Sequence, residues 1–322
     1  MNGFPDMPVK SYYNIADGMA GFLKEYTGSK SPVYSTIPRL DAMLNGGFRP
    51  GIHFIGGNTG AGKSSFCLWM MERMASLDDP DTGKPTGVTY LSLELSAAEV
   101  RARMGSRLSY ALDSLEPYRW ADFEGLGRKM HAAMQMDDYE PAHDPVYCAD
   151  LELMARCPNV RIVDAISDPS LSGVTHVQTE IEETGRHHGR VLFLDYRQCI
   201  DAPYGMDETD AMKDAVRAIN LAAIRAGVAV IAISAISRAK GSEMRSSGNR
   251  DKNPGADIFR GSSWIEYTGL TAFALVRRED ARRVGENVEV ELWPVKNRRG
   301  TCDGPVMLSY NGAYGEWTYG EA

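Results

Sequence analysis

Short, mostly apolar runs alternate with longer segments of helical spacing along most of the chain. The runs have the length of buried strands and cover residues 52–55, 88–93, 191–194 and 228–233. One intervening segment begins at Ser96 and has Glu99 three residues later, which is the spacing of a helix capping box. Strands that alternate with helices predict a mainly parallel sheet with helices on both faces, so we expect an α/β fold.

The pattern changes in the last quarter of the chain. Three strand-like runs follow one another without a helix between them: 270–276, 288–295 and 306–309. They predict an antiparallel C-terminal extension of the sheet. At the other end, residues 14–26 place apolar side chains on one helical stripe. We expect an N-terminal arm and linker helix over 1–35, and a main domain over 36–322 with an insertion at 113–158 that is helical and then irregular.

Residues Gly57 to Ser64 match the phosphate-binding pattern G-x-x-x-x-G-K-[ST] in full, between a predicted strand and a predicted helix. Here the glycines let successive backbone N–H groups, together with the helix N-terminus, point at a polyphosphate. Lys63 would neutralise the β- and γ-phosphates, and Ser64 would ligate Mg²⁺. The expected nucleotide-contacting residues are Gly57, Asn58, Thr59, Gly60, Ala61, Gly62, Lys63, Ser64 and Ser65. The sequence therefore predicts a nucleoside triphosphate site.

Acidic residues end two of the predicted strands. Asp195 follows four apolar residues in the Walker B pattern and would hold Mg²⁺ through water. Glu94 ends the strand after the phosphate-loop helix, where a carboxylate could accept a proton from attacking water. Capping of backbone is the alternative for either carboxylate. Ligands of open α/β sheets bind beyond the carboxyl ends of the strands, so we expect both residues in the site. Gln198, just beyond Asp195, is a candidate for relaying the nucleotide state.

Two groups of cations follow the last long apolar run. A loop rich in Gly, Ser and Asn carries the spaced cations Arg238, Lys240, Arg245, Arg250 and Lys252. Such a loop suits a sequence-independent grip on nucleic-acid phosphates, and a solvated loop is the alternative. Lys296 and Arg298 form a basic turn at the end of a later strand. Phosphoryl transfer gains from an arginine delivered to the γ-phosphate, often by another subunit.

The composition limits the classes of protein that remain. With 322 residues, the chain is long enough for one large α/β domain with appendages. Its net charge of −8 excludes a basic surface overall but allows a basic track in a channel. No apolar stretch has membrane-spanning length and no leader is evident, so we expect a cytoplasmic protein without a membrane partner. The five scattered cysteines predict no disulfide framework, and His131, His143, Cys148 and Cys157 fit no common zinc spacing.

Several short motifs, taken in order, resemble those of the DnaB-like replicative helicases. They are Leu40-Asp41, Gly46-Gly47, Ser92-Leu93-Glu94-Leu95, Asp195-Tyr196-x-Gln198, Ile265-Glu266 and Lys296-x-Arg298-x-Gly300. The resemblance covers about residues 35–311. It implies a RecA-like motor domain that uses ATP and Mg²⁺. It also implies a ring homo-oligomer, generally a hexamer, that moves along single-stranded DNA with ATP bound between subunits.

The resemblance also assigns roles to particular residues. Lys63, Ser64, Glu94 and Asp195 would act within one subunit. Arg298, supported by Lys296, would act on the nucleotide of a neighbouring subunit. The loop 238–254 would contact DNA in the central channel, and the helix near 14–26 would dock on the adjacent motor. A helicase loader is a further partner that such a protein could need.

Departures from the family pattern keep alternatives open. The family's Ser-Gln-Leu is Ser234-Ala235-Ile236 in this chain, and the missing glutamine normally helps to couple the γ-phosphate to the DNA loop. Only about 35 residues precede the core, so a primase-binding role is not expected. A RadA/RecA-like DNA-binding ATPase without processive unwinding is one alternative, and a KaiC-like regulatory ATPase acting on protein partners is another. A minimal motor of this kind suggests a phage or mobile-element replication protein.

Overall fold

The computed structural model describes Met19 and residues 29–320, apart from 113–116, 137, 139, 142–143, 169–170, 172, 196–207, 238–241, 243–252, 256–257, 260–264, 266–267 and 279. Its helices are α2 (Pro38–Met43), α3 (Lys63–Ala75), α4 (Ala97–Ala111), the short η2 (Trp120–Asp122), α5 (Phe123–Ala133), α6 (Pro145–Arg156), α7 (Val174–Arg186) and α8 (Glu208–Ala226). Its strands are β1 (Gly51–Gly57), β2 (Gly87–Ser92), β3 (Val160–Asp164), β4 (Gly189–Asp195), β5 (Ala229–Ala235), β6 (Thr271–Val276), β7 (Arg283–Val284), β8 (Asn287–Asn297), β9 (Val306–Asn311) and β10 (Glu316–Tyr319).

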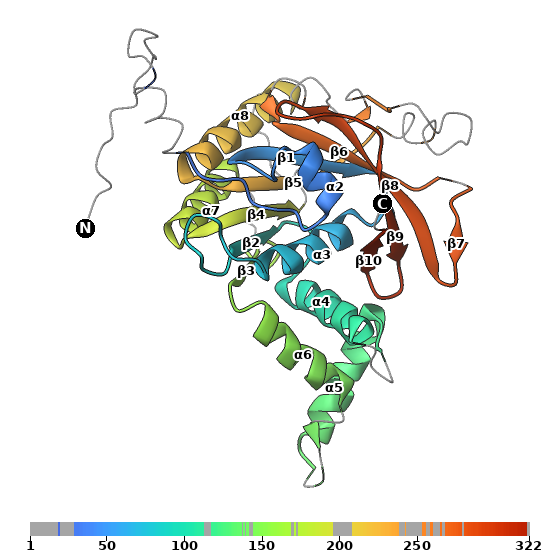
Figure 1. Ribbon diagram of the computed structural model, residues 1–322. Helices are drawn as coiled ribbons and strands as arrows, with labels where there is room; N and C mark the ends of the chain where they lie inside the picture. The colour runs from blue at the N-terminus through green and yellow to red at the C-terminus, as the bar shows by residue number, and fades with distance from the viewer. Residues whose placement is uncertain are drawn as a thin grey trace, which may run out of the picture.

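The strands form one sheet in the order β10-β9-β8-β6-β1-β5-β4-β2-β3, with β7 paired to β8 (Figure 1). The strands from β1 to β6 pair in parallel, and β8, β9 and β10 add an antiparallel extension. The predicted α/β class is therefore confirmed. One detail was wrong, because β6 was expected in the antiparallel part but pairs in parallel with β1. Residues 236–270 before it are long enough for a crossover to the same end of the sheet.

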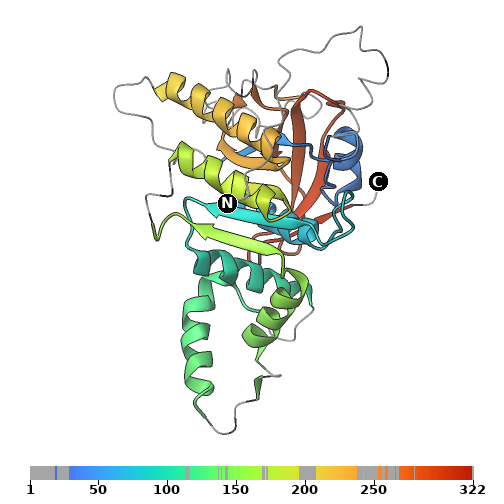
Figure 2. The same ribbon diagram turned by 90° about the vertical axis from the view of Figure 1, so that its left-hand side faces the viewer.

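The alternation of side chains along the strands divides the core between the two faces of the sheet. On one face, Tyr90 and Phe193 belong to a cluster that includes the apolar side of α3. On the other face, Leu91 and Leu192 pack with side chains of α7 and α8. Figures 1 and 2 show α7 and α8 lying side by side on their own face of the sheet. The helix α3 that carries the phosphate loop is therefore held from below by a fully apolar sheet surface.

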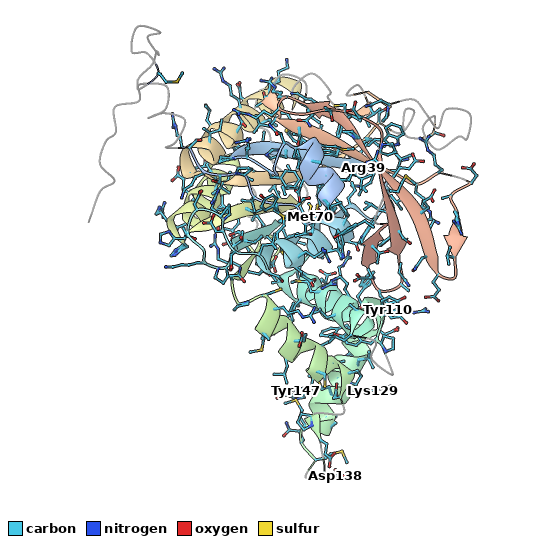
Figure 3. The ribbon with its side chains drawn as sticks, viewed as in Figure 1. Arg39, Met70, Tyr110, Lys129, Asp138 and Tyr147 are labelled. Carbon is cyan, nitrogen blue, oxygen red and sulfur yellow. The ribbon has the colours of Figure 1, made fainter. Side chains whose placement is uncertain are left out.

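A helical projection of α4, α5 and α6 extends from the face that α3 covers, as both ribbon views show (Figure 2). The predicted capping box at the start of α4 is confirmed, since Ser96 and Glu99 bond each other's backbone. The second half of the insertion was expected to be irregular, but it contains α6. Asp144 caps this helix by accepting from the amides of Val146 and Tyr147, at 2.8 and 3.1 Å. Figure 3 places Lys129, Tyr147 and Asp138 along the projection, far from the sheet.

An ion-pair cluster fixes the point where the core begins. Arg190 of β4 is 3% exposed and pairs with both Asp79 and Asp81. It also donates to the carbonyl of Ser31, whose amide donates to Asp81. The expected linker helix over 14–26 lies outside the described residues, apart from Met19. No helix in the described part of the chain combines the length and apolarity needed to cross a membrane.

Candidate nucleotide site

The loop between β1 and α3 has the backbone of a phosphate-binding loop. Gly60 and Gly62 have φ of +79° and +84°, values that residues with a Cβ rarely adopt. Gly62 is also the N-cap of α3 and has no side chain to bond the first helical amides. These amides therefore remain oriented toward an incoming anion. The Lys63 ammonium donates to the Asn58 carbonyl at 3.1 Å and so spans the loop.

The two predicted carboxylates come from neighbouring parallel strands. Asp195 is the last residue of β4 and pairs in register with Ser92, the last residue of β2. The amide of Leu93 then donates to the Asp195 carbonyl, and the amide of Leu95 donates to the Ser92 hydroxyl at 3.0 Å. This tight turn leaves Glu94 exposed at the carboxyl edge of the sheet.

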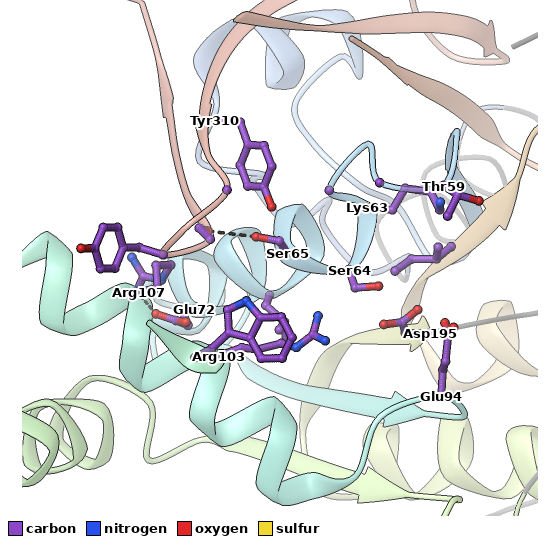
Figure 4. A pocket seen from close by; sticks show the side chains of 18 of the residues that line it. Thr59, Lys63, Ser64, Ser65, Glu72, Glu94, Arg103, Arg107, Asp195 and Tyr310 are labelled. Carbon is purple, nitrogen blue, oxygen red and sulfur yellow. Dashed lines mark hydrogen bonds and ion pairs between the residues drawn. The ribbon is translucent and has the colours of Figure 1, made fainter. Parts of the chain in front are cut away.

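The structure brings the predicted catalytic residues of the phosphate loop and the strand ends into one pocket of about 410 Å³ (Figure 4). Its lining includes Thr59, Gly60, Gly62, Lys63, Ser64, Ser65, Glu94 and Asp195. Ala235, at the end of β5, also lines it. Four chain segments that are distant in sequence thus converge at the carboxyl ends of β1, β2, β4 and β5, as expected for a ligand site in an open α/β sheet.

Asp195 is the most buried group of the site, with an exposed fraction of 0%. Burial raises the pKa of its carboxyl, although the hydroxyls of Tyr90 and Ser64 act in the opposite direction. Tyr90 keeps its proton, because burial raises the pKa of the phenol well above its ordinary value, and it donates to Asp195 Oδ2 at 2.5 Å. Among the described residues, Asp195 Oδ1 has no hydrogen-bond partner.

This unpartnered oxygen tests whether the site fits a metal ion. A buried carboxylate oxygen without a donor is costly unless a ligand completes it. The Ser64 hydroxyl and the Asp195 carboxylate are both oxygen ligands of the kind Mg²⁺ prefers. Burial also lowers the pKa of Lys63, while the charges of Asp195 and Glu94 act in the opposite direction. The donor set therefore fits Mg²⁺ with a polyphosphate.

The far wall of the pocket was missed by the sequence analysis. It is formed by the turn between β9 and β10 and contains Tyr310, Gly312, Tyr314 and Gly315. The Ser65 hydroxyl donates to the Gly315 carbonyl at 3.0 Å, which ties this turn to the start of α3. No local signal could identify these residues, because about 250 positions separate Ser65 from Gly315.

Two arginines of α4 form another part of the wall. The Arg103 guanidinium lies 4.3 Å from the centre of the Trp120 ring, and both side chains line the pocket. Arg107 pairs with Glu72 of α3 and, at 3.0 Å, with Glu316 of β10. Figure 4 shows Arg103 and Arg107 on the side of the pocket opposite Lys63. The walls that face a bound polyanion are therefore positively charged on two sides.

Arg298 and Lys296 lie away from this pocket. Lys296 pairs with Ala272 near the start of β6, and the Arg298 amide donates to the Leu270 carbonyl just before β6. The Leu270 amide in turn bonds the Ile52 carbonyl at the start of β1. Gly57 is five residues further along, or roughly 17 Å at 3.3 Å per residue. Arg298 is exposed at the opposite edge of the sheet from the phosphate loop.

The other predicted site residues cannot be placed. Gln198 and the loop cations Arg238, Lys240, Arg245, Arg250 and Lys252 lie outside the described residues, as does Glu266. Their predicted roles stay predictions.

Comparison with known proteins supports the fold. No protein-family model and no curated protein sequence matches the chain. Among solved structures, it is similar to the ATPase domain of a DnaB-like helicase, with a TM-score of 0.71 and 22% identity, over 96% of this chain and 100% of that one. It is also similar to a DnaB-like replicative helicase, described with its interactions with primase, with a TM-score of 0.69 and 22% identity, over 96% of this chain and 69% of that one. The predicted resemblance is thus confirmed at the level of a RecA-like fold.

Proposed function

We propose that this chain is an ATP-hydrolysing DNA motor of the DnaB-like helicase type. The observation that carries the proposal is the convergence of Lys63, Ser64, Glu94 and Asp195 in one pocket at the carboxyl edge of the sheet. A glycine-rich loop, a buried carboxylate and a second, exposed carboxylate are the parts that ATP hydrolysis requires. The similarity of the fold to helicase ATPase domains supports the same assignment.

Each of these residues has a distinct part in the proposed reaction. The Lys63 ammonium leaves the Asn58 carbonyl and binds the β- and γ-phosphates. Ser64 and Asp195 hold Mg²⁺, which neutralises phosphate charge and orients the phosphate oxygens when it is bound. Glu94, which is exposed to the solvent from which the attacking water comes, accepts the proton of that water.

The opposite placement of Arg298 supports action between subunits. An arginine at the amino edge of the sheet cannot reach the phosphate loop of its own chain. In a head-to-tail arrangement, however, the amino edge of one copy faces the carboxyl edge of the next, and repetition closes a ring. We therefore infer a ring oligomer, in which Arg298, with Lys296 beside it, completes the ATP site of the neighbouring copy.

Single-stranded DNA is the proposed track of the motor. The chain is acidic overall, so DNA contact would be confined to the cations of the loop 238–254, which suit phosphate binding without sequence preference. A loader that places the ring on DNA belongs to the same proposal.

The test is ATP hydrolysis by the purified protein, with and without single-stranded DNA, at low and moderate salt. Lys63→Ala provides the blank. We expect hydrolysis that DNA stimulates and that salt weakens, because phosphate contacts release counterions. Hydrolysis that is indifferent to DNA would instead indicate an ATPase that acts on protein partners.

A second candidate follows from Ala235. This residue lines the pocket where the helicase pattern has a glutamine, and a methyl group cannot hydrogen-bond to a γ-phosphate. Weaker coupling between ATP and DNA favours a RadA/RecA-like ATPase that remodels strands without processive unwinding. A forked DNA substrate separates the two, because only a helicase opens the fork while it hydrolyses ATP.

A further inference from the structure

Tyr90 is a buried phenol that reaches the predicted magnesium carboxylate from a neighbouring strand. It lies in the middle of β2, has an exposed fraction of 0%, and stacks on Phe193 of β4 with ring centres 6.3 Å apart. Tyr90 pairs in register with Phe193, and Asp195 lies two residues further along on the same face. The phenol therefore extends along the strand direction and donates to Asp195 Oδ2 at 2.5 Å.

The two oxygens of Asp195 are consequently in different surroundings. Oδ2 accepts the Tyr90 hydrogen bond, whereas Oδ1 is buried and has no hydrogen-bond partner in the described part of the chain. Rotation of an aspartate about its last torsion is soft and nearly two-fold, so burial alone does not fix the carboxylate plane. A donor of 2.5 Å length to one oxygen does fix it, because hydrogen bonds to carboxylates are short and strong.

We propose that Tyr90 is a positioning residue that sets the orientation of the Asp195 carboxylate, so that Oδ1 is presented to the metal–nucleotide complex. This proposal rests on the proposed ATP site. Tyr90 itself touches neither nucleotide nor metal, since it lies in the sheet and does not line the pocket. It acts only through Asp195, as second partners of metal-binding carboxylates do.

A simple packing role makes a different prediction from a positioning role. If the phenol only fills volume, Tyr90→Phe keeps the ring and its stacking on Phe193 and loses little. If it positions Asp195, the same variant removes the donor that fixes the carboxylate plane and leaves the group free to rotate. The loss then appears in the response to Mg²⁺ and not in the binding of metal-free nucleotide, which depends on Lys63 and the loop amides.

The experiment is an equilibrium titration of a fluorescent, non-hydrolysable ATP analogue, carried out in EDTA and over a series of Mg²⁺ concentrations. For Tyr90→Phe we expect affinity in EDTA within about twofold of the wild type. The Mg²⁺ concentration for half of the affinity gain should rise about tenfold, the lower end of what outer-partner substitutions cost. Tyr118→Phe removes another buried phenol hydroxyl, outside the pocket lining, and should leave both quantities unchanged.

A double-mutant cycle with Asp195→Asn tests whether the effect passes through Asp195. In that background, Tyr90→Phe should produce no further change in the Mg²⁺ response. Tyr90→Met removes the same donor with a flexible side chain and serves as the second variant if Tyr90→Phe does not fold, which thermal unfolding reports directly.

The outcomes separate this inference from the proposed function. An unchanged Mg²⁺ response in folded Tyr90→Phe or Tyr90→Met overturns the positioning role, as does an equal loss of affinity in EDTA and in Mg²⁺. If the wild type does not bind the analogue at all, the proposed ATP site itself falls and the positioning role falls with it. A selective tenfold shift that vanishes in the Asp195→Asn background supports both.

Discussion

The Trp317 ring packs directly against Gly62, the residue that precedes the lysine of the phosphate loop. A Cβ at Gly62 would lie 2.7 Å from the indole and 3.1 Å from the Tyr310 ring. Tyr310 and Trp317 stack with ring centres 4.2 Å apart, and the Trp317 indole N–H donates to the Ser65 hydroxyl at 3.2 Å. The C-terminal hairpin is therefore a rigid wall against which the phosphate loop is shaped.

Gly62→Ala should damage the site more than Gly60→Ala. Both glycines have positive φ, so alanine at either position costs about 1–2 kcal/mol of backbone strain. Only Gly62 also has the aromatic wall within contact distance, since nothing lies within 4 Å of a Cβ at Gly60. We expect a further loss on the order of 1–3 kcal/mol in the free energy of unfolding for Gly62→Ala, as for other overpacked sites. Urea denaturation of both variants measures this difference, and equal losses would remove the role of the wall.

Mixed oligomers should reveal whether Arg298 acts between subunits. Lys63→Ala and Arg298→Ala are each expected to abolish hydrolysis, with nucleotide binding largely retained in Arg298→Ala. In an equal mixture, about a quarter of head-to-tail interfaces join an intact phosphate loop to an intact Arg298. Activity should then return, as a phosphate-release assay on the exchanged mixture would measure. A mixture that stays inactive, despite verified subunit exchange, would contradict action between subunits.

Glu94→Gln should separate nucleotide binding from hydrolysis. The amide has the shape of the carboxylate but cannot accept the proton of the attacking water, so turnover should fall by about 10²–10⁴-fold. Affinity for ATP should remain, because Lys63 and the loop amides are intact. Single-turnover hydrolysis and equilibrium binding measure the two quantities.

Glu99→Gln is the matched control for that variant. Glu99 lies five residues further along, where it bonds the Ser96 backbone in the capping box of α4 and does not line the pocket. Its substitution should cost at most about 1 kcal/mol in the free energy of unfolding and leave turnover unchanged. An equal loss of turnover in both variants would show that the Glu94 effect is structural.

The parts of this molecule that sequence reasoning could predict are those that depend on neighbouring residues. The phosphate loop needs a strand, a glycine-rich turn and a helix in succession, and Asp195 and Glu94 need only the end of an apolar run. The capping box of α4 is likewise a four-residue signal. The α6 helix was missed although Asp144 and Pro145 form a local start signal, because apolar side chains in that segment follow no clear stripe.

The remaining features depend on register and on long-range pairing. Tyr90 and Asp195 are 105 positions apart and meet because β2 and β4 pair in one particular register. Tyr310 and Trp317 look like ordinary strand residues, and only the folding of the hairpin onto α3 makes them a wall of the pocket. The parallel pairing of β6 was also invisible, since it depends on how residues 236–270 return the chain to the sheet.

His53 of β1 should make the stability of the fold depend on pH. The Arg49 carbonyl can only accept, so His53 Nε2–H donates to it at 2.8 Å, and Nδ1 accepts from the Thr271 hydroxyl at 2.9 Å. Burial lowers the pKa of His53 to about 4, so the folded protein holds a neutral ring where the unfolded chain, with its ordinary value near 6.5, takes a proton. The stabilisation is fully present above pH 6.5 and is lost as the pH falls toward 4, on the order of 3 kcal/mol in total. Urea denaturation of the wild type and of His53→Gln between about pH 7.5 and 4 measures it as the difference between the two slopes, with His187→Gln, at an exposed site, as the control that keeps the wild-type slope. Parallel slopes for the wild type and His53→Gln would contradict a neutral buried imidazole.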